Sequence, residues 1–372
     1  MMSTKTGRGE ERIPRRFLFI VIAMTASCAV LVGLGYYIAS LFSGLIMIPR
    51  TRVEDFYECG ELILPLDQEV ITMQVSGGGD VLLVVIAGAA RGNNLLALYD
   101  LEGGAAQGPF WQREISGFRA RWVGTERRLA FEDGGDIWLL DLSAGEPAPV
   151  NLTSSEGFDE NPLPSPRGDF ILWTTSPPGS VATEFWCMLS NGREKGYLAP
   201  WQEMVAWSPA GDRVMSASPT VSQGAEGEAG YLLQEAKVGS SGWYYYLRSE
   251  EEVRCLWWPA IDELFFVAPR RLGEEGEMRA VWFKVEPSGR VLREASTDGL
   301  GADVSSYVFY PERGGKRIAY AGEKGLEILD MGREVISRYP GLEISPKILA
   351  WREAAEALLY PGPGGIYQLP LR

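Results

Sequence analysis

Carboxylates are the main side chains in this sequence that could do chemistry, because its 372 residues include no histidine. Without an imidazole the chain cannot use Ser-His-Asp or Cys-His nucleophilic catalysis, histidine-ligated zinc or histidine acid–base catalysis. A pair of Asp or Glu residues could still hydrolyse a glycosidic bond, with one as the acid and the other as the nucleophile or base. Carboxylate-dependent hydrolysis is therefore the enzymatic possibility that we carry forward.

The candidate binding residues lie in polar stretches between β-rich runs. They are seven acidic residues and one tryptophan, namely Glu132, Asp133, Glu156, Asp159, Glu160, Asp298, Asp303 and Trp201. Such a negative face would bind a cation or a basic partner, although a solvated acidic surface gives the same pattern. The sequence has neither the Asp-x-Asp-x-Asp/Gly spacing of a calcium loop nor a cofactor fingerprint, so we expect no metal and no cofactor.

The stretch from Asp136 to Thr175 shows which elements must position these residues. It contains four short β-rich runs, at Asp136–Asp141, Pro149–Leu152, Asn161–Pro166 and Phe170–Thr175. Turn-forming residues separate the runs, and no helical period connects them. This order is typical of one period of a β-propeller.

The segment Met204-Val-Ala-Trp-Ser-Pro-Ala-Gly-Asp212 points to a family. It resembles the repeat of TolB-like and WD-type β-propellers, in which an aromatic-Ser-Pro-Asp-Gly turn joins the two inner strands of each blade. The resemblance covers about Gly60 to Arg372. Arg167 and Ala210 stand where the family has Asp, so the turn is degenerate.

The predicted fold class is all-β, a seven-bladed β-propeller preceded by one transmembrane helix, with six or eight blades as alternatives. The run Glu61–Leu66 has no local partner, and the chain ends in a blade of only three strands. The resemblance implies that the N-terminal strand completes this last blade and so removes an exposed edge. Loops between successive blades would then gather the candidate residues on one face.

Tryptophan recurs at the end of predicted inner strands, at Trp122, Trp207, Trp257 or Trp258, and Trp351. Inner strands of a propeller are crowded, and an aromatic side chain buries a large area there. We therefore interpret these tryptophans as packing residues between blades. Trp201 precedes an inner strand and is the better candidate for ligand contact.

A long uncharged segment precedes the propeller. Phe17–Leu41 is long enough to cross a bilayer, and most basic residues nearby lie on its N-terminal side. The sequence thus predicts a cytoplasmic tail at 1–16, a signal anchor at 17–48, a linker at 49–59 and an extracytoplasmic propeller at 60–372. A cleaved signal peptide, lipidation at Cys28 and a twin-arginine signal at Arg15-Arg16 are alternatives.

The net charge of −14 argues against nucleic acid as a partner, since an acidic surface repels phosphates. With no Asp-box and no sialidase-type arginine cluster, the sequence favours a membrane-tethered, non-catalytic propeller that binds a protein or another ligand. Its expected partners are the membrane, through the N-terminal helix, and a protein. The alternative is a carboxylate-dependent propeller enzyme acting on an extracellular glycan.

Overall fold

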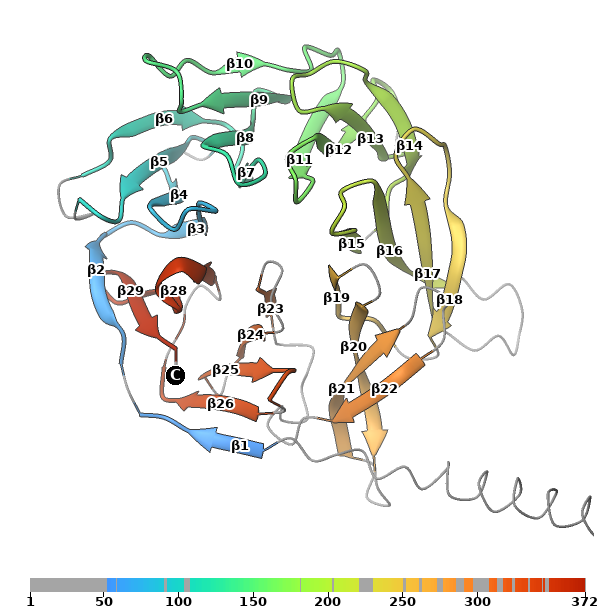
Figure 1. The fold of residues 1–372 in the computed structure, drawn as a ribbon. Helices are drawn as coiled ribbons and strands as arrows, with labels where there is room; N and C mark the ends of the chain where they lie inside the picture. The colour runs from blue at the N-terminus through green and yellow to red at the C-terminus, as the bar shows by residue number, and fades with distance from the viewer. Residues whose placement is uncertain are drawn as a thin grey trace, which may run out of the picture. The chain divides into compact units, whose positions relative to one another are not determined.

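The structure of the chain is a computed structural model. It describes residues 52–371 except 58, 90–91, 104–107, 181, 203, 221–229, 250–251, 261–262, 273–276, 286–290, 297–307, 313–316, 323–324, 334, 343 and 345–347. Within these residues the chain is almost entirely β-strand, and its sheets are arranged around a central axis (Figure 1). The fold is a β-propeller.

Five sheets consist of four consecutive strands in chain order, each antiparallel to the next. The first sheet comprises β3 (Val70–Val75), β4 (Val81–Ala87), β5 (Asn94–Asp100) and β6 (Trp111–Ile115). The second comprises β7 (Ala120–Trp122), β8 (Arg128–Asp133), β9 (Asp136–Asp141) and β10 (Val150–Asn151). The third comprises β11 (Phe158–Pro164), β12 (Phe170–Ser176), β13 (Glu184–Leu189) and β14 (Gly196–Pro200). The fourth sheet comprises β15 (Met204–Trp207), β16 (Arg213–Thr220), β17 (Gly230–Lys237) and β18 (Tyr244–Ser249). The fifth comprises β19 (Cys255–Ala260), β20 (Glu263–Leu272), β21 (Glu277–Val285) and β22 (Val291–Ser296). We name each blade after its inner strand, the first of its four in the chain.

The β27 blade joins the two ends of the propeller domain. It contains β27 (Ala350–Arg352), β28 (Ala357–Gly362) and β29 (Gly365–Pro370), with a 3₁₀ turn, η3 (Glu353–Ala355), after the inner strand. Its fourth and outermost strand is β2 (Glu61–Pro65), antiparallel to β29 with Leu62 opposite Tyr367 and Leu64 opposite Ile366. The pairing of the first propeller strand with the last, expected from the sequence, is therefore present.

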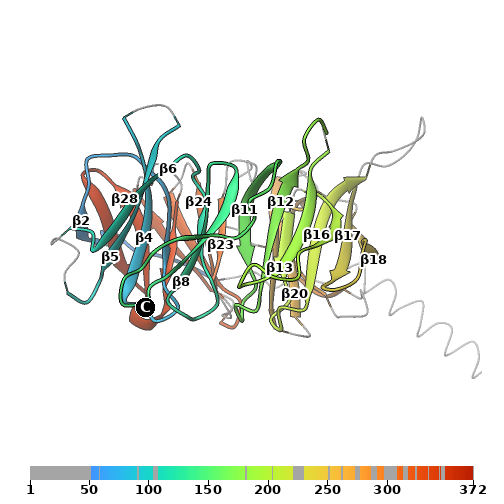
Figure 2. The same ribbon diagram turned by 90° about the horizontal axis from the view of Figure 1, so that it is seen from above.

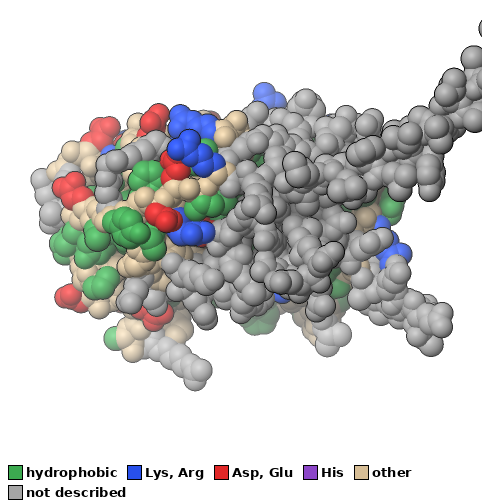
Figure 3. All heavy atoms as spheres, turned by 90° about the horizontal axis from the view of Figure 1, so that it is seen from below, with side chains coloured by type: hydrophobic (Ala, Val, Ile, Leu, Met, Phe, Trp, Pro, Cys, Tyr) green, Lys and Arg blue, Asp and Glu red, His purple; other side chains and the backbone are tan. Residues whose placement is uncertain are grey.

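The β23 blade has five strands. Four of them, β23 (Val308–Pro311), β24 (Arg317–Gly322), β25 (Gly325–Asp330) and β26 (Val335–Pro340), are antiparallel neighbours. The fifth is β1 (Arg52–Asp55), which lies parallel to β26 with Asp55 opposite Arg338. Arg338 and Asp55 also approach each other to 3.7 Å. Figure 3, seen from below the view of Figure 1, shows basic and acidic side chains interspersed on the described part of that face.

The predicted fold class is corrected in its blade organisation. Six sheets, not seven, are four-stranded blades of the expected kind in the part of the chain that the structure describes, and the remaining sheet has a fifth, parallel strand. Residues 49–59, predicted as a linker, contain that strand. Backbone pairing with β26 explains why β1 forms a strand despite its polar sequence.

The predicted transmembrane helix is also corrected. No helix among the described residues is long and apolar enough to cross a membrane. The predicted tail 1–16 and signal anchor 17–48 lie outside those residues. We therefore do not retain the transmembrane helix or the single-pass, extracytoplasmic localisation expected from the sequence.

The core lies between neighbouring blades, as β4 illustrates. Successive side chains of a strand point to opposite faces, and both faces of this strand are covered. Leu82 and Val84 pack toward the β27 blade with Leu64, whereas Leu83 and Val85 pack toward the β7 blade. This double burial explains the unbroken apolar run of β4, and Figure 2 shows the strands of successive blades inclined across the thickness of the propeller.

Candidate ligand-binding cavity

The inner strands surround a central cavity of about 590 Å³. Six blades contribute to its walls, which include all of β3 after Val70 and single side chains such as Arg121, Trp207 and Tyr310. A second cavity, of about 540 Å³, adjoins the first, because both are lined by Trp207, Pro166, Pro311, Gly77 and Glu353. The second cavity extends the space toward the β19 blade.

Three tryptophans hold neighbouring inner strands together in the walls of the central cavity. Each indole N–H donates a hydrogen bond to a backbone carbonyl of the preceding blade, and the pairs are Trp122 to Gln74 (3.4 Å), Trp207 to Leu163 (2.9 Å) and Trp351 to Tyr310 (2.8 Å). Trp257 and Trp258 are buried at the inner strand of the β19 blade. The interpretation of these residues as packing between blades is confirmed. The rings are consequently fixed before any ligand arrives.

Arg121 is the basic residue in the wall of the central cavity. It lies on β7 between the buried Ala120 and Trp122. Its Nε is buried without a hydrogen-bond partner, and its guanidinium makes no ion pair among the residues that the structure describes. Burial lowers the pKa of Arg121, and the nearby Arg119 lowers it further. An anion inside the cavity would counter both effects.

Tyr310 and Gln74 are two further polar residues in the lining of the central cavity. Burial raises the pKa of Tyr310 to about 12, although the Arg121 charge opposes that rise. Tyr310 is therefore a neutral phenol at physiological pH. Gln74 Oε1 accepts a hydrogen bond from the backbone N–H of Trp122 at 3.4 Å. That bond leaves the Gln74 amide NH₂ group as a donor on the strand next to Arg121.

Two of the predicted binding residues are buried structural acceptors. Glu132, 5% exposed, accepts hydrogen bonds from the backbone N–H groups of Phe118 (2.9 Å), Arg119 (3.1 Å) and Asn161 (2.9 Å). It thereby connects the β7 blade to the β11 blade. Asp159, 2% exposed, accepts from the indole of Trp173 at 3.0 Å.

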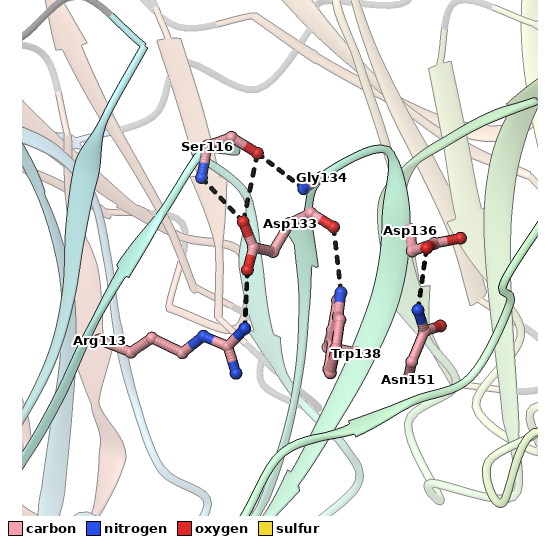
Figure 4. Close-up of polar contacts among 7 residues, drawn as sticks. All are labelled: Arg113, Ser116, Asp133, Gly134, Asp136, Trp138 and Asn151. Atoms are coloured by element: carbon pink, nitrogen blue, oxygen red, sulfur yellow. Dashed lines mark hydrogen bonds and ion pairs between the residues drawn. The ribbon is translucent and has the colours of Figure 1, made fainter.

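Asp133 is also occupied by internal contacts (Figure 4). Its carboxylate pairs with Arg113 at 2.9 Å and accepts a hydrogen bond from the backbone N–H of Ser116 at 3.0 Å. Its backbone carbonyl accepts from the indole of Trp138, over which the Arg113 guanidinium lies at 4.8 Å. A carboxylate held in this way fixes the loop between two blades.

The other predicted binding residues do not lie in the central cavity. Glu156 and Glu160 are exposed, and Trp201 is 47% exposed outside the cavity lining. Asp298 and Asp303 lie outside the described residues. A binding role for this acidic face stays a prediction. No cluster of three or more metal-ligating side chains is found among the described residues.

The sequence contained one signal for the central cavity that its interpretation missed. At the inner-strand position that immediately precedes the tryptophan, the β15 and β27 blades have Ala206 and Ala350. The β7 blade has Arg121 there, beside Trp122. A charge at a position where other blades place a small apolar residue indicates a special environment.

Comparison with known proteins supports the fold and no more. No protein-family model matches the sequence, and no curated protein is similar enough to be recognised as a relative. Among solved structures, Kuenenia stuttgartiensis hydrazine synthase is 12% identical with a TM-score of 0.57, over 85% of this chain and 98% of that one. The β-propeller domain of the Trilobed protease from Pyrococcus furiosus is 11% identical with a TM-score of 0.54, over 79% and 90%.

Pyrococcus horikoshii acylaminoacyl peptidase is 11% identical with a TM-score of 0.56, and the match covers 81% of this chain but only 51% of the peptidase. The chain thus belongs to the β-propeller class of folds. The propeller implied by the sequence resemblance is confirmed, whereas the TolB-like or WD-type assignment finds no support in a family match. The similarity to peptidases concerns the fold, and the described residues offer no histidine for their chemistry.

Proposed function

We propose that this chain is a ligand-binding propeller without a catalytic role of its own, and that the adjoining central cavities are its binding site. The observation that carries the proposal is the set of indole rings fixed by hydrogen bonds around the central cavity of about 590 Å³. Ligand sites in proteins typically have volumes of about 300–1,000 Å³ and are largely preformed. A wall that is already rigid loses little conformational freedom on binding.

The chemistry of the lining favours a compact ligand with a planar apolar group. Trp207 lines both cavities, and prolines 166 and 311 border the space that they share. Aromatic groups pack favourably against such rings in offset or edge-to-face arrangements. The ligand would be a small molecule or a short segment of a protein partner that presents such a group.

Nothing in this lining favours the glycan-hydrolysing alternative. Hydrolysis requires two carboxyl groups about 5–10 Å apart across a sugar, one of them able to give up a proton. Two carboxylates line the second cavity, namely Glu312, which is paired with Arg317, and the exposed Glu353. Asp133 and Asp159, two of the candidate binding residues, are held by Arg113 and Trp173.

A matched pair of tryptophan variants tests the proposal. Binding of three probes, benzoate, benzamide and indole, is measured on the full chain by ligand-observed NMR. Trp207→Leu removes a ring from both cavities and should weaken binding about tenfold or more, since an aromatic contact and its buried area are lost. Trp201→Leu removes an exposed ring outside the cavities and should leave binding unchanged.

The folded state of each variant is checked by circular dichroism. If Trp207→Leu does not fold, Trp207→Phe keeps a smaller ring and takes its place, with a smaller expected loss. Absence of binding for all three probes, or equal binding by the two leucine variants, would refute the proposed function.

A further inference from the structure

Several half-buried arginines of the described residues, though not all of them, have a carboxylate partner. Arg113 pairs with Asp133 at 2.9 Å, Arg338 pairs with Glu327 at 2.7 Å, and Arg317 pairs with Glu312. Arg121 has no such carboxylate, although the chain has 49 Asp and Glu residues and a net charge of −14. A buried cation without a partner is normally neutralised, paired or replaced by an apolar residue.

The charged and titratable groups that act on Arg121 do not neutralise it. Arg119, two residues earlier, is a second cation, and its guanidinium lies over the ring of Phe118 at 4.7 Å. Glu132 attracts Arg121 without forming an ion pair with it, and its two oxygens accept backbone hydrogen bonds. Tyr310 across the cavity is a neutral phenol. The Arg121 side of the cavity is therefore electropositive inside an acidic protein.

Gln74 provides a second donor next to this cation. Gln74 and Arg121 lie on neighbouring inner strands, and both line the central cavity. The backbone N–H of Trp122 occupies the oxygen of the Gln74 amide, which orients the NH₂ group away from that bond. A guanidinium and an amide NH₂ group together offer several N–H donors, and an oxyanion accepts several such bonds.

We infer that Arg121 and Gln74 form an oxyanion subsite in the central cavity, which binds the carboxylate or phosphate group of the ligand. This inference rests on the proposed function, because the subsite is one part of the cavity assigned there. The planar fork of Arg121 takes both oxygens of the anion, and Gln74 donates to one of them. The indole rings and prolines then contact the apolar body of the ligand.

The test compares charged and neutral probes on the full chain. Benzoate and benzamide have the same ring and nearly the same shape, and only benzoate carries an anionic group. Benzoate should bind the wild-type protein about tenfold more tightly than benzamide, which is the effect of a charge-assisted bidentate contact. Inorganic phosphate, as a competitor of benzoate, distinguishes a carboxylate site from a phosphate site.

Two arginine variants provide the matched control. Arg121→Gln should remove the preference for benzoate, because it should weaken benzoate binding much more than benzamide binding. Arg119→Gln removes the same charge two residues away, outside the cavity lining, and should change benzoate binding by no more than about twofold, because a screened charge acts weakly. Arg121→Lys should retain part of the preference, since it keeps the charge without the planar fork.

The outcomes separate this inference from the proposed function. Displacement of benzoate by phosphate, dependent on Arg121, supports an oxyanion site that prefers phosphate. Equal binding of benzoate and benzamide, unaffected by Arg121→Gln, overturns the oxyanion subsite and leaves the aromatic cavity intact. Failure of every probe to bind overturns both.

A thermal scan provides an independent readout. Removal of a buried unpaired charge should not destabilise the fold, so Arg121→Leu should unfold at or above the wild-type temperature. A marked fall in the unfolding temperature of that variant would assign Arg121 a structural role and overturn the inference.

Discussion

Replacement of Glu132 by glutamine should destabilise the propeller strongly, because this buried carboxylate joins two blades. One of its oxygens accepts from the backbone N–H groups of Phe118 and Arg119, which lead into the inner strand of the β7 blade. The other accepts from the backbone N–H of Asn161 on the inner strand of the β11 blade. Asn161 itself has a φ of 55°, so its backbone conformation depends on this support.

The magnitude follows from the three bonds. In Glu132→Gln one oxygen can still accept from Phe118 and Arg119, but those bonds lose their charge assistance, at a cost of about 1 kcal/mol in total. The amide NH₂ group then faces the N–H of Asn161, and a buried donor without an acceptor costs roughly 2 kcal/mol. The free energy of unfolding should therefore fall by about 3 kcal/mol.

Urea unfolding followed by circular dichroism at 25 °C measures this change. Glu156→Gln is the matched control, because Glu156 is exposed and its substitution should change stability by no more than about 0.5 kcal/mol. Equal urea midpoints for the two variants would refute the structural role assigned to Glu132.

Four further predictions concern other parts of the described chain. Burial raises the pKa of the Cys187 and Cys255 thiols to about 12. In the native state at pH 8, iodoacetamide should therefore modify the exposed Cys59 but neither of these two buried thiols. Peptide mass spectrometry would show which cysteines are modified. These two thiols and Tyr310 ionise later in the folded than in the unfolded state. Their contribution to stability should therefore be constant below about pH 8 and be lost as pH rises from about 9 to 12. A flat urea midpoint between about pH 9 and 12 would contradict the burial of these groups. Arg338→Met leaves the buried Glu327 carboxylate without its partner and should lower the free energy of unfolding by about 3 kcal/mol. Adding Glu327→Gln should recover part of this loss. A double variant no more stable than Arg338→Met would count against the importance of the pair. Gly168→Ala places a Cβ 3.0 Å from the Gly124 Cα at a φ of 78°, so it should lower the urea midpoint, whereas alanine at Gly145, where no atom lies within 4 Å, should not.

The sequence predicted the regular strands well because their hydrophobic pattern reports burial directly. The predicted run Asp136–Asp141 coincides with β9, and Phe170–Thr175 differs from β12 by one residue. The closing strand was predictable for another reason, since a three-stranded last blade and an unpaired apolar run imply each other. In both cases the physical cause, burial or an unfilled edge, leaves a mark in the residue types.

β1 left no such mark. Its sequence Arg-Val-Glu-Asp has one apolar residue, and none of its four side chains is fully buried. It is held by parallel backbone pairing with β26, by the contact of Asp55 with Arg338 and by the stacking of Phe56 on Tyr339 at 5.4 Å. Backbone hydrogen bonds do not depend on side-chain type, so a polar strand of this kind resembles a linker in the sequence.

The sequence alone does not show how an acidic residue in a loop is used, because such a residue has two opposite uses. Glu132 and Asp133 look alike in sequence to residues of a solvated binding face, yet they accept backbone and arginine donors inside the fold. Which use applies depends on donors contributed by another blade. Arg121 presents the converse case, because its lack of a partner is visible only after six blades have been assembled around it.

The cavity and the closure of the propeller are therefore coupled. Walls of the central cavity come from β3 at one end of the propeller and from β27 at the other, and β2, which precedes β3 in the chain, is the outermost strand of the β27 blade. Leu64 of β2 packs in one hydrophobic cluster with Met73 of β3, Ala350 of β27 and Ile366 of β29. A substitution that detaches β2, such as Leu64→Asp, should consequently weaken benzoate binding although residue 64 does not line the cavity. Since β2 forms the outer edge of its blade, retained binding with a lowered unfolding temperature would show instead that the inner strands keep their arrangement without the closing strand.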